Sequence, residues 1–182
     1  MSGNIKGIHR EFQKLERKRE LLMLTLIPLT TQQYSQQPSP DSWSAIQAAN
    51  HVYLSEKLSL GYLQKKLSYP DTIPPFHPKS WGGVLLIKLV FATGYKWKAP
   101  KTIDMRQDQP ILTPAELNEQ WPLFRKQLFS FIESHQASFG SHLVYNHPYA
   151  GRMTMHQMLM FLNDHLAHHI KQINRILKKV KS

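Results

Sequence analysis

The chain has 182 residues, and 41% of them are hydrophobic, which predicts a globular protein rather than a disordered one. Cysteine is absent, which excludes disulfides, thiolate metal sites and a cysteine nucleophile, so any metal must be held by histidine, carboxylate or water. The formal net charge of +11 bears on solubility and non-specific attraction, not on the fold. No recognised nucleic-acid motif accompanies this charge, so we interpret it as solvated helix faces.

The sequence contains no run of 18 apolar residues, so we expect no membrane span. The apolar run LLMLTLIPL at 21–29 follows basic residues as the core of a signal peptide would. However, Glu11, Glu16 and Glu20 precede it and no small-residue cleavage site follows it. We therefore interpret it as the buried end of a helix and expect the protein in the cytoplasm.

Two long helices are predicted in the first part of the chain. The first covers about residues 4–28 and is limited by Pro28. Its apolar stripe consists of Ile5, Ile8, Phe12, Leu15, Leu22 and Leu26. A polar, proline-containing connector follows at 30–42, and either Asp41 or Ser42 could cap a second helix over about 43–68.

The middle of the chain is less regular. Residues 69–80 contain four prolines, which exclude regular structure there. The apolar segment WGGVLLIKLVF at 81–91 suits a strand or a short helix, and the helical neighbourhood favours the helix. We expect a long loop over 92–113.

Two capping boxes mark the last two long helices. The sequence TPAE at 113–116 predicts a helix that reaches about His135, and a loop is expected at 139–151. The sequence TMHQ at 154–157 begins a final helix over about 154–180.

Four long helices of similar length predict an all-α protein. The expected architecture is a four-helix bundle with long connections and a short extra helix. We expect it to form a single domain over residues 1–182.

The last helix carries three histidines within HLAHHIKQI at 165–173. Its expected buried seam consists of Met155, Met158, Leu162, His165, His169, Ile173, Ile176 and Val180. His165 and His169 therefore point inward one turn apart, where two histidines can bind one transition metal. His168 lies about 100° round the helix and faces the edge of the core or water. The alternative is a pair of core histidines bonded to buried partners, and the pair alone does not decide between the two.

Among the seven other histidines, His51 is the one deep within another long helix. Leu58 and Tyr62 lie within about 20° of its direction, so we expect this face to be directed to the core. The small residues around it, Ser44, Ala48 and Ser55, leave room for a ligand. Taken alone, His51 is a packing histidine.

Three stretches together resemble one known family. They are WSAIQAANHVYLSEK at 43–57, HPYAGRMTMHQMLMFLNDH at 147–165 and HLAHHIKQINRI at 165–176. They are similar to a Trp-Ser helix start followed by His and Glu, a Pro-x-x-Gly turn, and a His-x-x-His-His-x-x-Gln ending. These features are typical of the DinB-like superfamily, which contains the bacillithiol and mycothiol transferases.

The resemblance implies a four-helix bundle with a metal triad, which falls here on His51, His165 and His169. His168 corresponds to a histidine that does not bind the metal. Zn²⁺ and Ni²⁺ suit such nitrogen ligands best, and Fe²⁺ and Mn²⁺ also fit. The relatives also imply a low-molecular-weight thiol as cofactor and a homodimer. None of the three stretches falls in the segment 70–113, and we expect that segment to set substrate choice.

Three functions follow from these patterns. The first is a metal-dependent enzyme: either a transferase joining a thiol to a small electrophile such as an alkyl halide or epoxide, which is what the thiol-transferase relatives imply, or a hydrolase of small molecules. The alternative is a non-enzymatic, stress-related binding module whose metal is structural. The third is nucleic-acid binding through the basic ends of the chain, which predicts steep salt dependence.

Four polar residues near the histidines could orient their rings: Asn50, Glu56, Asp164 and Gln172. The sequence does not choose among them. Glu56 lies about 140° from His51, which makes it a surface or inter-helix partner rather than a ligand. Trp43 and Tyr62 could line a cleft, although aromatic residues on helices more often belong to the core.

Overall fold

The computed structural model describes residues 2–93, 103–105 and 109–180. Its long helices are α1 (Ser2–Leu26), α3 (Ala45–Leu67), α5 (Pro114–Phe139) and α6 (Met155–Val180). Shorter elements are α2 (Thr31–Ser35), a 3₁₀ turn at Pro70–Thr72, α4 (Ser80–Thr93), β1 (Tyr145–His147) and β2 (Gly151–Met153). The prediction of an all-α protein is confirmed.

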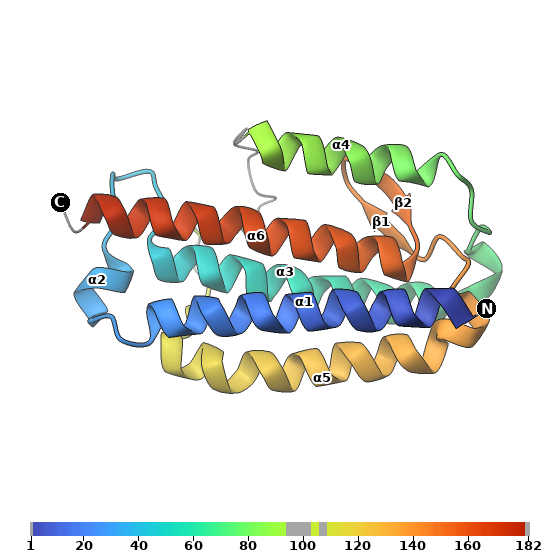
Figure 1. Cartoon of the computed structure of the whole chain (residues 1–182), viewed down its shortest axis with the longest axis horizontal. Coiled ribbons are helices and arrows are strands. Elements are labelled where there is room, and N and C mark those ends of the chain that lie inside the picture. The colour runs from blue at the N-terminus through green and yellow to red at the C-terminus, as the bar shows by residue number, and fades with distance from the viewer. Residues whose placement is uncertain (1, 94–102, 106–108, 181–182) are drawn as a thin grey trace.

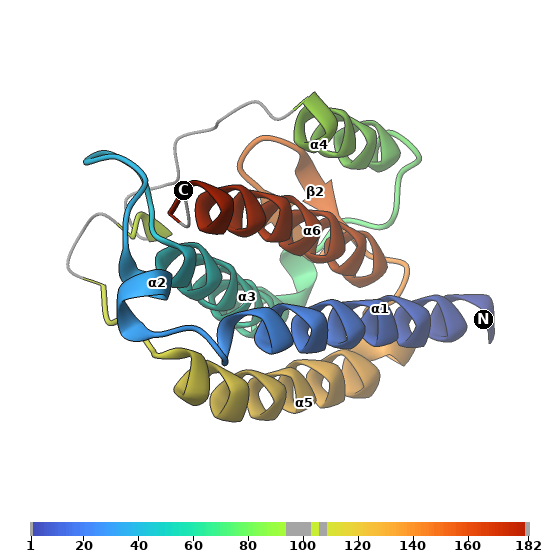
Figure 2. The same ribbon diagram turned by 60° about the vertical axis from the view of Figure 1, so that its left-hand side comes forward.

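The four long helices lie alongside one another (Figure 1). Both α1 and α3 pack against α5 and against α6, so each of them lies between α5 and α6. Helix α4 lies outside this group and packs on α6 and on β2, as Figure 2 shows from a second direction. The finer expectations, a four-helix bundle and a single domain over 1–182, stay predictions.

Local capping explains where the long helices begin. Thr113 with Glu116 caps α5 and Thr154 with Gln157 caps α6, as predicted. The predicted cap of α3 at Asp41 or Ser42 is wrong, because Ser44 caps it. Gln47 lies three residues after Ser44 and accepts from its backbone N–H at 2.8 Å, whereas the hydroxyl of Ser42 is bonded to Ser39.

The connections contain more structure than their composition predicts. The connector 30–42 includes α2, and the expected loop 139–151 includes β1, which pairs antiparallel with β2. The short helix predicted at 81–91 is confirmed as α4. The long loop predicted over 92–113 lies largely outside the described residues, which resume at 103–105 and 109–113.

The apolar stripes of the long helices meet in one core. The α5 stripe of Leu117, Trp121, Phe124, Leu128 and Ile132 is buried throughout. The predicted α1 stripe is buried except for Ile5, which lies near the start of α1 and is 47% exposed. Among the described residues, none of the helices combines the length and apolar character needed to cross a bilayer.

Two adjacent glycines of α4 differ in their surroundings. A Cβ atom on Gly83 would collide with the carbonyl oxygen of Ala150, in the turn of the β hairpin. A Cβ atom on Gly82 would meet nothing within 4 Å. Gly83 therefore permits the close approach of α4 to the hairpin, whereas Gly82 has no such role.

We expect Gly83→Ala to lower the free energy of unfolding by about 1–3 kcal/mol, because the added methyl group must push α4 away from the hairpin. Gly82→Ala is the matched control and should raise it by about 0.5 kcal/mol through better helix propensity. Urea denaturation of both variants measures the difference. Equal stability of the two variants would contradict the close approach.

Candidate metal centre

Three histidine side chains from two helices meet at one point. Helix α3 supplies His51, and α6 supplies His165 and His169 one turn apart. The Nε2 atom of His165 lies 3.3 Å from that of His51 and 3.0 Å from that of His169. Each of the three offers one ligand nitrogen, these nitrogens all lie within 4.8 Å of one another, and all three residues are buried. The cluster could therefore hold a metal ion.

Hydrogen bonds at the outer nitrogens fix two of the rings. The Nδ1 atom of His51 lies 2.8 Å from the carbonyl oxygen of Ile103, and Nδ1 of His169 lies 2.8 Å from Oε1 of Gln172. Both partners are acceptors, so each Nδ1 carries the hydrogen and each Nε2 keeps a free lone pair. Those lone pairs are directed at the centre, which is the tautomer that a metal ligand needs.

Burial keeps the cluster uncharged. Desolvation is the main cause that lowers the pKa of all three rings, and the pKa values of His165 and His169 fall well below the ordinary value. Repulsion between neighbouring imidazoles lowers the pKa of His165 and His169 further. The three rings are therefore neutral near pH 7, which is the form that binds metals.

The short nitrogen–nitrogen distances need a bridging charge or proton. Without one, Nε2 of His165 faces two lone pairs, and a single hydrogen on it can bond well to one neighbour at a time. Nδ1 of His165 is buried without a hydrogen-bond partner in the described part of the chain. A divalent cation can accept all three lone pairs at once, so the donor set fits Zn²⁺ or Ni²⁺.

Aromatic rings surround the cluster. The ring of Trp43 lies 4.7 Å from that of His51, while Phe91 of α4 and Phe161 of α6 lie 5.9 and 5.5 Å from that of His165. His168 is half-buried beside Phe91 and outside the group of three, which agrees with its predicted place at the edge of the core. These rings lower the local dielectric and strengthen electrostatic interactions at the centre.

The prediction for the rest of the His51 face is wrong. Leu58 is 46% exposed and Tyr62 is 37% exposed, although both were expected to face the core. His51 is instead covered by segment 103–105. The carbonyl oxygen of Ile103 accepts a hydrogen bond from the His51 ring, and that of Met105 accepts one from the side chain of Gln47. Both contacts fall on the first two turns of α3 and do not reach Leu58.

The structure assigns different roles to the four polar candidates. Gln172 is the one that accepts a hydrogen bond from a ring of the cluster, that of His169. Asn50 bonds to the backbone of Leu112, Asp164 is half-buried, and Glu56 is an inter-helix partner of Arg125, as predicted. Glu56 is fully buried, however, and not at the surface. The carbonyl of Ile103 was not predicted, because a backbone acceptor in an irregular segment leaves no signal in the sequence.

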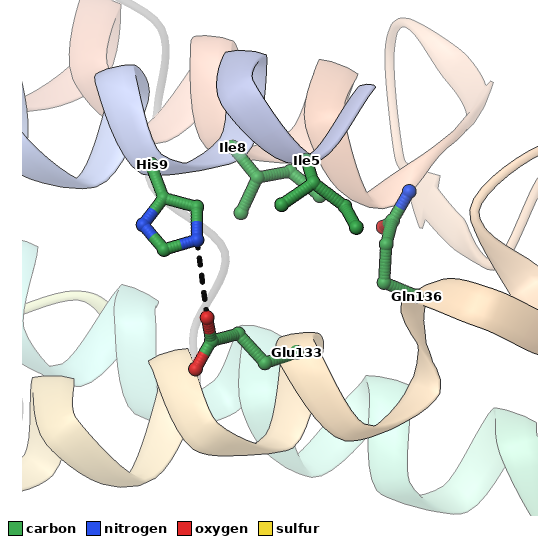
Figure 3. Close-up of a pocket in the computed structure, with 5 residues that line it drawn as sticks. All are labelled: Ile5, Ile8, His9, Glu133 and Gln136. Atoms are coloured by element: carbon green, nitrogen blue, oxygen red, sulfur yellow. Dashed lines mark ion pairs between the residues drawn. The ribbon is translucent and has the colours of Figure 1, made fainter. Parts of the chain in front are cut away.

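The remaining histidines do not join the centre. His147, expected in a loop, is buried in β1, where its Nδ1 accepts from the backbone N–H groups of Tyr149 and Ala150, and burial lowers its pKa to about 4. His9 pairs with Glu133 at 3.1 Å beside a cavity of about 70 Å³ between α1 and α5, also lined by Ile5, Ile8 and Gln136 (Figure 3). A cavity of that size suits water rather than a substrate.

Comparison with known proteins bears on the family. The family model described as the DinB superfamily matches residues 14–173, which is most of the chain. The match covers all three histidines of the centre. No curated protein and no solved structure matches the chain. The chain therefore belongs to the DinB superfamily, as its three sequence stretches predicted.

Proposed function

We propose that the protein is a metal-dependent enzyme that joins the sulfur of a low-molecular-weight thiol to a small electrophile. The observation that supports this most is the convergence of three neutral Nε2 atoms, at 3.0 and 3.3 Å, from His51, His165 and His169. Three protein ligands leave a coordination position open, which is typical of catalytic rather than structural sites. Zn²⁺ or Ni²⁺ suits the nitrogen set best.

A divalent ion held there would act as a Lewis acid and lower the pKa of a thiol or of water beside it. The thiol sulfur would then attack carbon. With an alkyl halide the new S–C bond replaces the carbon–halogen bond and the thiol proton passes to solvent; with an epoxide it replaces one C–O bond and the opened oxygen takes up that proton. The three histidines would hold the metal ion. The carbonyl of Ile103 keeps the ring of His51 oriented, and the side chain of Gln172 does the same for the ring of His169. Trp43, Phe91 and Phe161 offer an apolar wall against which an alkyl halide or epoxide can lie. Hydrolysis of a small molecule is the second reaction that the same donor set supports.

The test is halide release from an alkyl halide in the presence of a thiol and the Zn²⁺- or Ni²⁺-loaded protein. We expect turnover that disappears in His51→Ala and persists in His135→Ala, because His135 lies on α5 and bonds within its own helix. Tight metal binding without halide release, and without hydrolysis when the thiol is omitted, would favour the alternative of a binding module with a structural metal.

Removing the support of His169 should weaken metal binding without removing a ligand. We expect Gln172→Leu to lower the metal affinity about 10- to 100-fold, because Nδ1 of His169 loses its acceptor. Gln172→Glu is the matched control, since it keeps an oxygen acceptor and should retain the affinity. Competition titration with a chelator measures both, and equal affinities for the two variants would contradict this role.

The expectations for other partners stay proposals. A small-molecule substrate follows from the enzyme proposal, and a homodimer follows from the family. The lysines near the end of α6, Lys178 and Lys179, are exposed, as either a solvated helix face or a nucleic-acid interface would require. We interpret them as part of a solvated helix face. Addition of the protein should then leave the electrophoretic mobility of DNA unchanged even at low salt.

A further inference from the structure

A second, shallow and open site lies away from the three histidines of the metal centre, between the start of α4 and the β hairpin. Figure 1 shows α4 alongside this hairpin. Its volume is about 430 Å³, and it is largely open to solvent. It is lined by His77, Lys79, Ser80, Leu143, Ala150 and Arg152. Leu143 is buried, Ala150 is half-buried, and the two cationic side chains are exposed. The site thus combines a partly apolar wall with a basic rim.

Backbone contacts hold its walls together. The N–H of Phe76 donates to the carbonyl oxygen of Ser141 at 2.8 Å, and the N–H of Leu143 donates to that of Pro74 at 2.9 Å. Gly83 brings α4 directly against the carbonyl of Ala150. Three separate segments are therefore fixed relative to one another, so the backbone around the site is preformed.

The hydroxyl of Ser80 is oriented by a chain of hydrogen bonds. Oε1 of Gln157 accepts from the backbone N–H of Thr154, so the amide nitrogen of Gln157 must be the atom 3.0 Å from Oγ of Ser80. Ser80 accepts that bond, which leaves its own hydrogen to donate. Ser80 is only 8% exposed, and no acceptor for this hydrogen lies within bonding distance among the described residues.

The other polar groups are donors as well. Nδ1 of His77 accepts from the backbone N–H of Lys79, so the hydrogen of the neutral ring is on Nε2. Neither Lys79 nor Arg152 forms an ion pair with a described residue, and the lining includes no acidic side chain. The lining side chains thus present a hydroxyl, an imidazole N–H, an ammonium and a guanidinium, but no carboxylate.

We propose that this site binds the oxyanion group, phosphate or carboxylate, of a small molecule. A set of donor side chains without a competing carboxylate is complementary to a ligand that only accepts, and a guanidinium and an ammonium supply the charge. The site is distinct from the metal centre. Gln157, which orients Ser80, precedes His165 by eight residues on α6, which is about 12 Å along the helix. The proposal therefore stands whether or not the metal-dependent activity does.

The experiment is a titration of the ¹⁵N-labelled full chain with inorganic phosphate and, separately, with succinate at constant ionic strength. We expect saturable shifts of the backbone amides of Lys79, Ser80, Ala150 and Arg152 with at least one of the two anions. Arg152→Gln should weaken that binding at least tenfold. Arg17→Gln is the matched control, because Arg17 is also exposed and lies on α1, and it should change the affinity less than twofold.

The responding anion tells whether the group is a phosphate or a carboxylate. His165→Ala should bind the anion as well as the wild type does, because the proposed site is distinct from the metal centre. Binding of an anion at the metal centre would instead be lost in that variant. Absence of saturable shifts with both anions would overturn the proposal. So would equal weakening in Arg152→Gln and Arg17→Gln, which would indicate general attraction to a basic protein.

Discussion

Replacing His165 with alanine is expected to remove the metal from the protein. We expect the wild type to carry about one divalent transition metal per chain and His165→Ala to carry less than about a tenth of that. Four-ligand zinc sites bind with about 10–16 kcal/mol, so losing one ligand removes roughly 3–4 kcal/mol, or a hundred- to a thousandfold in affinity. His165 is the sharpest choice because its Nε2 is the nitrogen that lies within 3.3 Å of both others. Metal analysis of the purified, untagged proteins measures the difference.

His168→Ala is the matched control, since His168 is a neighbour on the same helix but contacts Phe91 and lies outside the group of three. It should retain the metal. Loss of metal in both variants would indicate that α6 itself had been perturbed. A wild type that stays metal-free after loading with Zn²⁺, Ni²⁺ or Mn²⁺ would mean that the three residues are core histidines, and the enzyme proposal would lose its main support.

The parts of this centre differ in how far the sequence predicts them. His165 and His169 are four residues apart on a helix whose start is marked by a capping box, so their shared direction is a local property. His51, by contrast, lies 114 positions before His165 in the sequence, on a different helix. Its place deep in a long helix and the resemblance to a family predict it, not a local spacing. That the three nitrogens bind a metal stays a prediction, whereas their convergence is a property of the fold.

The features that were missed depend on tertiary contacts. The carbonyl of Ile103 is an acceptor because of where an irregular segment crosses α3, and any residue there could provide it. The exposure of Leu58 has the same origin, since helical periodicity gives the direction of a side chain but not where the covering segment ends. The hairpin formed by β1 and β2 was hidden within a loop prediction because each strand is three residues long.

Replacing Arg125 with methionine is expected to lower the free energy of unfolding by about 3–5 kcal/mol, because it leaves the buried carboxylate of Glu56 without a cation. Nη2 and Nε of Arg125 donate to Glu56 at 2.7 and 2.9 Å, and Nη1 donates to Glu16 at 2.9 Å. Burial acts to lower the pKa of Arg125, but Glu56 and Glu16 outweigh it and raise that pKa, so the guanidinium stays charged. Trp121 donates a further bond to Glu56 at 2.7 Å.

Urea denaturation measures the loss. Lys126→Met is the matched control on the same helix, and it should change stability by no more than about 0.5 kcal/mol because Lys126 is exposed. An Arg125→Met variant as stable as this control would contradict the importance of the ion pair.

The double variant Arg125→Met, Glu56→Leu separates charge from geometry. Two apolar side chains need no partner, so the double variant should recover most of the stability, less about 1–3 kcal/mol for the unpaired N–H of Trp121.

Glu56 lies about 140° round α3 from His51, so its bond to α5 turns His51 toward α6. We therefore expect the double variant to bind metal more weakly than the wild type although it is folded. Wild-type metal affinity in the double variant would show that packing alone sets the rotation of α3, and that the ion pair contributes stability without positioning the centre.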